Sequence, residues 1–196
     1  MCGVDVLKGK NGDCLVYSVG SSNDIKFEQA VKKHMGCEIH TFDPTVSESS
    51  FVGHDTAVFH QWGFGSDGEP AEASDPARGN FSWTGKSLEI VVQDLGHSHR
   101  TIDILKIDCE GCEWQVLKDI FSSIKKRRVQ IDQILVEMHY KTNKKGLETL
   151  FQHMDSAGLR LFHKERNQWG CDGWACVEYA MATSNFLRKV NTQILC

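Results

Sequence analysis

The amino-acid sequence predicts an α/β fold, with a mostly parallel sheet of seven strands, helices on both faces and an antiparallel hairpin at one edge. The first observation is that short apolar runs alternate with segments of helical spacing over most of the chain, which is typical of parallel βα units. The second is that the last two apolar runs have no helical segment between them, which favours an antiparallel pair. The third is size, because 196 residues with 40% apolar content suit one domain with one core.

The strands are expected where apolar runs end at turn-forming residues. Helices are expected where apolar residues recur every three or four positions, as for Phe27, Val31 and His34 on one face. Ser87 is placed to cap a helix, and Gly158 to end one. The predicted strands are 14–19, 37–42, 57–62, 102–107, 131–136, 159–163 and 174–182; the predicted helices are 24–34, 87–95, 113–124 and 145–157, with a weaker helical pattern at 186–190.

A single domain is predicted for residues 1–196. Residues 63–85 are rich in Gly, Ser, Asp, Glu and Pro, which indicates a long surface insertion. Its aromatic end, Phe81-Ser82-Trp83, suits a short hairpin or a lid. Residues 183–196 are interpreted as a C-terminal tail.

Composition excludes some classes of function. A net charge of -4 argues against a dedicated nucleic-acid binder, which carries a basic face. No segment has the ~20 apolar residues of a membrane span, and residues 1–13 lack the apolar core of a signal peptide. We expect a soluble domain, with the cytoplasm as the default compartment. The secretory lumen is the alternative compartment, because the chain has 8 cysteines and a glycosylation sequon at Asn80.

Polar residues follow the first three predicted strands, where ligands of open α/β sheets bind. Gly20 allows a close approach of backbone to a ligand, and the amides after it lie at a helix N-terminus. Asp43 is placed to accept hydrogen bonds from ribose hydroxyls, and Trp62 to form a wall for adenine. The predicted nucleoside-binding residues of these three loops are Val19, Gly20, Ser21, Ser22, Asn23, Asp24, Asp43 and Trp62.

The spacing of Gly20 and Asp43 also fits a nicotinamide dinucleotide. That ligand needs glycines at three positions so that backbone can crowd the pyrophosphate. This loop has one glycine, followed by Ser21, Ser22 and Asn23. The polar loop therefore favours an adenosyl ligand without phosphates, such as S-adenosylmethionine.

Three carboxylates, Asp108, Glu110 and Glu113, stand between a predicted strand and a predicted helix. Glu113 is interpreted as a charge on the first helical turn, where acids are favourable. Asp108 and Glu110 precede the helix and are predicted to face the ligand crevice, with Asp108 also touching the cofactor.

The segment Lys106-Ile107-Asp108-Cys109-Glu110-Gly111-Cys112-Glu113 resembles the signature motif of FkbM-like methyltransferases. Gly20, Asp43 and the segment Leu135-Val136-Glu137-Met138-His139 are similar to other parts of that family, the last in its animal methyltransferase-like branch. The resemblance implies a Rossmann-like class I methyltransferase fold, S-adenosylmethionine as cofactor, and O-methylation of a sugar-like or other small hydroxyl acceptor. Cys109 and Cys112 depart from the family pattern.

The mechanism that follows uses four candidate catalytic residues. Asp108 and Glu110 would line the junction of donor and acceptor, and Glu137 and His139 would face the acceptor. A hydroxyl acceptor must lose its proton, which suits a carboxylate or histidine base, and His139 is the first candidate. These four side chains could also offer metal ligands, but no dense ligand motif requires a metal and none is predicted.

Two alternatives use the cysteines. Cys109 and Cys112 form a C-x-x-C pair before a helix, as in thioredoxin-like oxidoreductases. The chain's prolines, Pro44, Pro70 and Pro76, all precede that pair, so the downstream proline of those proteins is missing. A zinc site with Cys171 and Cys176 would need unusual spacing, and those two residues could instead form a local disulfide. A non-catalytic binding module is the third alternative.

Overall fold

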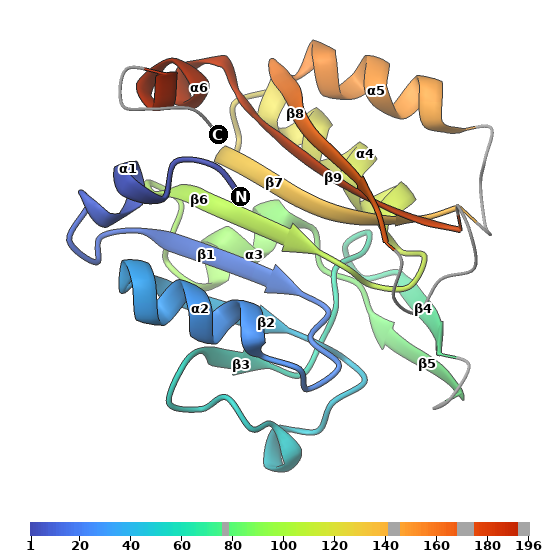
Figure 1. The fold of residues 1–196 in the computed structure, drawn as a ribbon. Helices are drawn as coiled ribbons and strands as arrows, with labels where there is room; N and C mark the ends of the chain where they lie inside the picture. Colours follow the sequence, from blue (N-terminus) through green and yellow to red (C-terminus); the bar gives the residue numbers. More distant parts are fainter. Residues whose placement is uncertain (76–78, 141–145, 168–174, 192–196) are drawn as a thin grey trace.

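A computed structural model describes residues 1–75, 79–140, 146–167 and 175–191. A seven-stranded sheet runs through its centre in the order β3-β2-β1-β6-β7-β9-β8 (Figure 1). The strands are β1 (Leu15–Val19), β2 (Glu38–Phe42), β3 (Val58–His60), β6 (Thr101–Ile107), β7 (Gln130–His139), β8 (Leu159–Arg166) and β9 (Cys176–Thr183). This arrangement confirms the predicted α/β sheet of Rossmann-like type.

The order of the strands reverses beside β1. The chain first runs outward from β1 to β2 and β3, and then returns to place β6 on the other side of β1. Val19 is in register with Phe42 on one side and with Ile107 on the other, so three parallel strands end at the same level. Such a reversal opens a crevice at the carboxyl ends of the strands, where ligands of this fold class bind.

The far edge of the sheet is the predicted antiparallel hairpin. β9 runs antiparallel to both β7 and β8, whereas β1, β2, β3, β6 and β7 are mutually parallel neighbours. Antiparallel neighbours do not need the crossover helix that joins parallel strands.

Helices cover both faces of the sheet because each carries one apolar stripe. The helices α1 (Val4–Lys8), α2 (Lys26–Met35) and α6 (Ser184–Asn191) pack on one face through Leu7, Val31 and Phe186. The helices α3 (Leu88–Asp94), α4 (Glu113–Lys125) and α5 (Leu147–Ser156) pack on the other. Figure 1 shows α1 and α2 on the near side and α3 and α4 behind the strands.

The structure corrects several expected boundaries. The third strand is shorter than expected and ends at His60, whereas β7 continues to His139. The weak helical pattern expected at 186–190 is confirmed by α6, so residues 184–191 of the expected C-terminal tail form a helix that buries Phe186 and Val190. The helix α1 and the one-turn η1 (Glu48–Ser50) were not expected from the sequence pattern.

The insertion at 63–85 contains a second, two-stranded antiparallel sheet, made of β4 (Pro70–Asp75) and β5 (Gly79–Thr84). This hairpin matches the one expected at the aromatic end of the insertion and lies beside the carboxyl ends of the central strands (Figure 1). Within the described residues, no helix is long and apolar enough to cross a membrane.

Candidate active site

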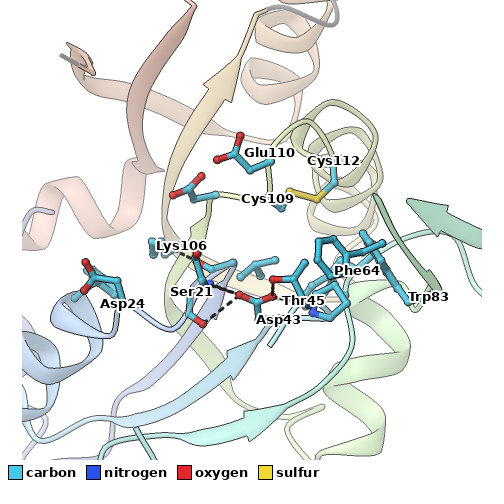
Figure 2. Close-up of a pocket in the computed structure, with 18 of the residues that line it drawn as sticks. Ser21, Asp24, Asp43, Thr45, Phe64, Trp83, Lys106, Cys109, Glu110 and Cys112 are labelled. Carbon is cyan, nitrogen blue, oxygen red and sulfur yellow. Dashed lines mark hydrogen bonds between the residues drawn. A yellow bond between two sulfur atoms is a disulfide. The ribbon is translucent and has the colours of Figure 1, made fainter. Parts of the chain in front are cut away.

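A cavity of about 400 Å³ lies at the carboxyl ends of β1, β2 and β6. Its walls come from the loops after these strands, from the loop after β3 and from β5 (Figure 2). This volume is typical of small-molecule sites. Of the predicted nucleoside-binding residues, the ones that line the cavity are Val19, Gly20, Ser21, Ser22, Asp24, Asp43 and Asp108.

Gly20 brings the loop after β1 against the end of β6. Its φ is +77°, and a Cβ built on it would lie 1.6 Å from the backbone oxygen of Asp108. The Lys106 ammonium donates a hydrogen bond to the Gly20 carbonyl at 2.7 Å, and the Asp108 amide donates to the Val19 carbonyl at 2.9 Å. Glycine is required here because no side chain fits between the two loops.

Asp43 joins the loop after β2 to the loop after β1. Its Oδ2 accepts hydrogen bonds from the amide and hydroxyl of Ser21 and the amide of Ser22, and its Oδ1 accepts from the amide and hydroxyl of Thr45. Burial raises the pKa of Asp43, but the hydrogen bonds from Thr45, Ser22 and Ser21 outweigh it and hold the pKa below its ordinary value. Asp43 therefore stays ionised and fixes both loops, and its contact with ribose stays a prediction.

Two aromatic rings, Phe64 and Trp83, form the apolar wall of the cavity (Figure 2). The Trp83 indole N–H donates to the Phe64 carbonyl at 3.3 Å, which ties the hairpin to the loop after β3. Trp62, predicted as this wall, does not line the cavity. Its ring packs 5.0 Å from that of Phe42 and lies under the Lys86 ammonium, because β3 ends early and the chain turns Trp62 toward the core.

Asn23, predicted to bind the nucleoside, does not line the cavity. Its side-chain amide donates to the Ser50 carbonyl at 2.9 Å, and its oxygen accepts from the Val52 amide at 3.0 Å. Asn23 thus holds the loop after β2 rather than lining the cavity.

Glu113 organises the turn between β6 and α4. Its side chain is fully buried, and its Oε1 accepts hydrogen bonds from the amides of Cys109 and Gly111 at 3.0 and 3.2 Å. Between them Glu110 has a φ of +56°, which is unusual for a residue with a side chain. The Cys109–Cys112 disulfide spans the same turn and lines the cavity. Glu113 was interpreted from sequence as a first-turn charge, but its carboxylate points back under the turn.

His139, at the end of β7, lies among carboxylates. Its Nδ1 is 2.9 Å from Glu113 Oε1, and its Nε2 is 3.3 Å from Glu110 Oε2 and 3.9 Å from Glu137 Oε1. Burial lowers the pKa of His139, but the hydrogen bond and charge of Glu113, helped by Glu110, raise it to about 9. His139 is therefore an imidazolium at neutral pH and has no lone pair with which to accept a proton.

The pKa values of Asp108 and Glu137 are both raised above their ordinary values. Burial raises the pKa of Asp108, against the opposing charges of Lys106 and His139. Burial and the charge of Asp108 raise the pKa of Glu137, which accepts a hydrogen bond from Asn167 at 2.9 Å. Asp108 lines both the main cavity and a second one of about 190 Å³ that Glu137 also lines. The four predicted catalytic residues are thus neighbours, with Asp108 where the two cavities meet.

The site also has groups that could hold a metal. Ligand atoms of Asp108, Glu110 and His139 lie within 4.8 Å of one another. A zinc site on Cys109 and Cys112 is ruled out in this state, because both sulfurs are in a disulfide. The predicted roles of Cys171 fall outside the described residues.

Three side chains of the site were not singled out from sequence for the roles they have. Thr45 and Lys106 act through contacts with loops distant in the chain, and Phe64 follows the predicted aromatic residue by two positions. A Thr two residues after Asp43 is a recognisable turn signal. The positions of Lys106 and Phe64 depend on how the strands pair, which the sequence pattern alone does not give.

Comparisons with known proteins show the family to which the chain belongs. A family model described as "Methyltransferase domain" matches residues 1–182. The chain is 28% identical over 173 residues to "Probable methyltransferase-like protein 24" of Homo sapiens, covering 81% of this chain and 44% of that protein. It is 32% identical over 128 residues to the protein of the same name in Rattus norvegicus, and this match covers 64% of this chain and 33% of that protein. The chain thus spans less than half the length of these relatives.

Among solved structures, the fold is similar to that of the Methanococcus jannaschii fibrillarin pre-rRNA processing protein. The TM-score is 0.51 at 7% identity, and the match covers 88% of this chain and 67% of that one. At this identity, the likeness shows the fold alone.

Proposed function

The chain belongs to the methyltransferase domain family, whose methyl donor is S-adenosylmethionine, and from this premise we propose that it methylates a hydroxyl group of a small molecule or glycan. The FkbM-like branch is part of the same proposal and rests on the segment from Lys106 to Glu113. The observation that carries the acceptor class is Asp108, a half-buried carboxylate of raised pKa that lines two cavities.

The residues of the main cavity suit S-adenosylmethionine. Asp108 and Glu110 offer negative charge near a sulfonium. The two lysines that line the cavity are engaged, Lys26 with Asp24 at 2.6 Å and Lys106 with the Gly20 carbonyl. The rings of Phe64 and Trp83 offer flat apolar contact for adenine. The loop of Ser21 and Ser22 offers polar groups to the amino-acid and ribose parts.

When bound, the donor supplies an electrophilic methyl group, so the protein's main task is to place an oxygen nucleophile in line with it. A hydroxyl oxygen attacks well only if its proton has a place to go. We assign Asp108 as the group that takes this proton, because burial raises the pKa of its carboxyl group and so makes it a better proton acceptor. The imidazolium of His139 holds Glu110 and Glu113 in position rather than acting as the base.

A two-step experiment tests this proposal. Calorimetry with S-adenosylmethionine measures donor binding, and transfer of labelled methyl groups to panels of hydroxyl, amine and thiol acceptors measures the reaction. We expect hydroxyl products only, and we expect Asp108→Asn to lose transfer while still binding the donor. Asp55→Asn, a change at an exposed residue that does not line the cavity, is the control. Methylated amines or thiols, or full transfer by Asp108→Asn, would contradict the proposal.

A further inference from the structure

A second cluster of ionisable side chains lies apart from the cavity, at the amino end of β2. Glu38 begins β2, His40 is two residues along the same strand, and His97 lies in the loop after α3. The Nε2 atoms of both histidines face the same oxygen, Glu38 Oε1, at 2.9 Å for His40 and 3.3 Å for His97. None of the three residues lines the main cavity.

We propose that Glu38, His40 and His97 bind one divalent transition-metal ion, with Zn²⁺ as the best-fitting ion. Two imidazoles and a carboxylate are a common protein ligand set for Zn²⁺, with water completing the coordination. In a tetrahedral site of normal bond lengths, ligand atoms stand about 3.3 Å apart. The two nitrogen–oxygen distances are close to that value, and all three ligand atoms lie within 4.8 Å of one another.

Both imidazoles are held by their other ring nitrogen. His97 Nδ1 lies 2.8 Å from the Tyr17 hydroxyl, and His40 Nδ1 lies 2.9 Å from His60 Nε2. A hydroxyl oxygen and a neutral imidazole nitrogen can each accept an N–H, so both histidines can carry their proton on Nδ1 and turn a bare Nε2 toward the ion. Such outer hydrogen bonds are the usual support of metal-bound histidines.

Burial and charge also suit an ion here. His40 and His97 are buried, and Tyr17 behind them has no exposed surface, so the rings have little freedom to turn away. The Glu38 side chain is 41% exposed, which gives an ion a route from solvent and leaves room for water ligands. Arg100 holds the other carboxylate oxygen, Oε2, at 2.5 Å and lies 3.9 Å from Asp13. Oε1 is thereby left directed at the two imidazoles.

An ion at this position would crosslink β2 to the loop after α3, which are separated in the chain by more than one strand and helix. The proposal concerns a binding site with a structural effect and does not depend on methyl transfer. The metal-site proposal can therefore be tested independently of the proposed function.

The test is a titration of the chelator-treated full chain with Zn²⁺ by calorimetry, with the thermal unfolding midpoint followed in parallel. We expect one site of micromolar or tighter affinity and a rise in the midpoint, because ligands of the folded state stabilise it. His97→Gln and Glu38→Gln should each weaken binding about tenfold or more, and Tyr17→Phe about tenfold through the lost outer hydrogen bond. His34→Gln, at an exposed helical position, should bind as the unchanged chain does.

Glu110→Gln separates this site from the carboxylate cluster of the active site. The proposal expects unchanged Zn²⁺ binding in that variant. Circular dichroism checks that each variant folds, and Glu38→Gln is the safest change because its side chain is half-exposed. Absence of 1:1 binding, equal affinity of His97→Gln and the unchanged chain, or loss of binding only in Glu110→Gln would each overturn the proposal.

Discussion

Single side chains shape the active site chiefly by bonding to the protein's own backbone. Asp43 accepts hydrogen bonds from two loops, and Glu113 accepts them from the turn that carries Asp108 and Glu110. Charge-assisted hydrogen bonds of this kind are stronger than neutral ones. Asp43 and Glu113 thus hold the walls of the site in place, whereas Asp108 and Glu110 line the cavity.

Asp43→Asn should weaken donor binding and lower stability together. An amide group cannot accept the hydrogen bonds that a second carboxylate oxygen accepts, so donors at Ser21 and Ser22 or at Thr45 lose their partner. We expect a loss of about 1–3 kcal/mol in the free energy of unfolding and a weaker affinity for S-adenosylmethionine. Urea unfolding and calorimetry measure the two effects, and Asp55→Asn, which is exposed, should change neither. Unchanged affinity would remove Asp43 from the donor site.

His139 should make stability depend on pH. Its pKa is about 9 in the folded chain and 6.5 ordinarily, so its contribution is fully present below pH 6.5 and is lost as the pH rises through 9. The free energy of unfolding should therefore fall over this range by more in the unchanged chain than in His139→Gln. Urea unfolding at several pH values tests this, with exposed His163→Gln as the control. Parallel curves for the unchanged chain and His139→Gln would show that His139 is not an imidazolium held by Glu113.

For single residues, the location in the site could be predicted from the sequence, whereas the role of each residue was harder to predict. Asp108 and Glu110 follow β6, and Glu137 and His139 lie at the end of β7. That these strand ends converge could be inferred from the pattern of strands. The partnership of Glu113 with His139 joins positions 26 residues apart and depends on the side-chain direction on the first turn of α4. No periodicity encodes such a direction.

Among the elements, the loops after β1 and β6 are in close contact. The left-handed backbone of Gly20 lies directly against the Asp108 carbonyl, so neither loop can shift alone. The hairpin of β4 and β5 adds the aromatic wall from outside the central sheet. The cavity is therefore built by strand ends on one side and by an insertion on the other.

Gly20→Ala should abolish donor binding, because it adds a steric clash to the strain of a left-handed backbone. A left-handed alanine costs about 1–2 kcal/mol by itself, and at this position its Cβ would also collide with the Asp108 carbonyl. Gly96→Ala is the matched control, because its φ is +73° and nothing lies within 4 Å of the added Cβ. We expect donor binding to be lost in Gly20→Ala and kept in Gly96→Ala. Similar affinity in both variants would contradict the close packing of the two loops.

The elements were predictable where apolar spacing is regular and less so at the edges. The alternation of strands and helices and the final hairpin followed from the pattern. By contrast, β3 has only three residues in register with β2, so the apolar run around it extends beyond the strand itself. The helix α6 is short and has only two buried residues, Phe186 and Val190, so the sequence gives only a weak helical pattern at 186–190.

The whole molecule is tied together by disulfides as well as by its core. Cys14 and Cys37 are both fully buried and join the starts of β1 and β2 across a sequence separation of 23 residues. Cys109 and Cys112 are separated by only three positions. Because a crosslink restricts the unfolded chain more when it closes a longer loop, the first bond should contribute more to stability.

Removing the longer crosslink tests this directly. Cys14→Ala with Cys37→Ala should lower the free energy of unfolding by about 3 kcal/mol, and Cys109→Ala with Cys112→Ala by about half as much. The second pair should keep methyl transfer largely intact, because the amide hydrogen bonds to Glu113 still hold the turn. Urea unfolding without reductant and a methyl-transfer assay check both statements. Loss of transfer in a folded Cys109/Cys112 variant would favour a redox role for this pair.

The hydrogen bonds that Asp43 receives have a consequence for the thermodynamics of ligand capture. The loops around Gly20 and Thr45 are already ordered by the protein itself, so their conformational entropy is lost during folding and not when a ligand arrives. Ligand binding to such a site should therefore cost the chain little further conformational entropy. The heat-capacity change of binding should reflect the burial of ligand surface rather than the folding of loops.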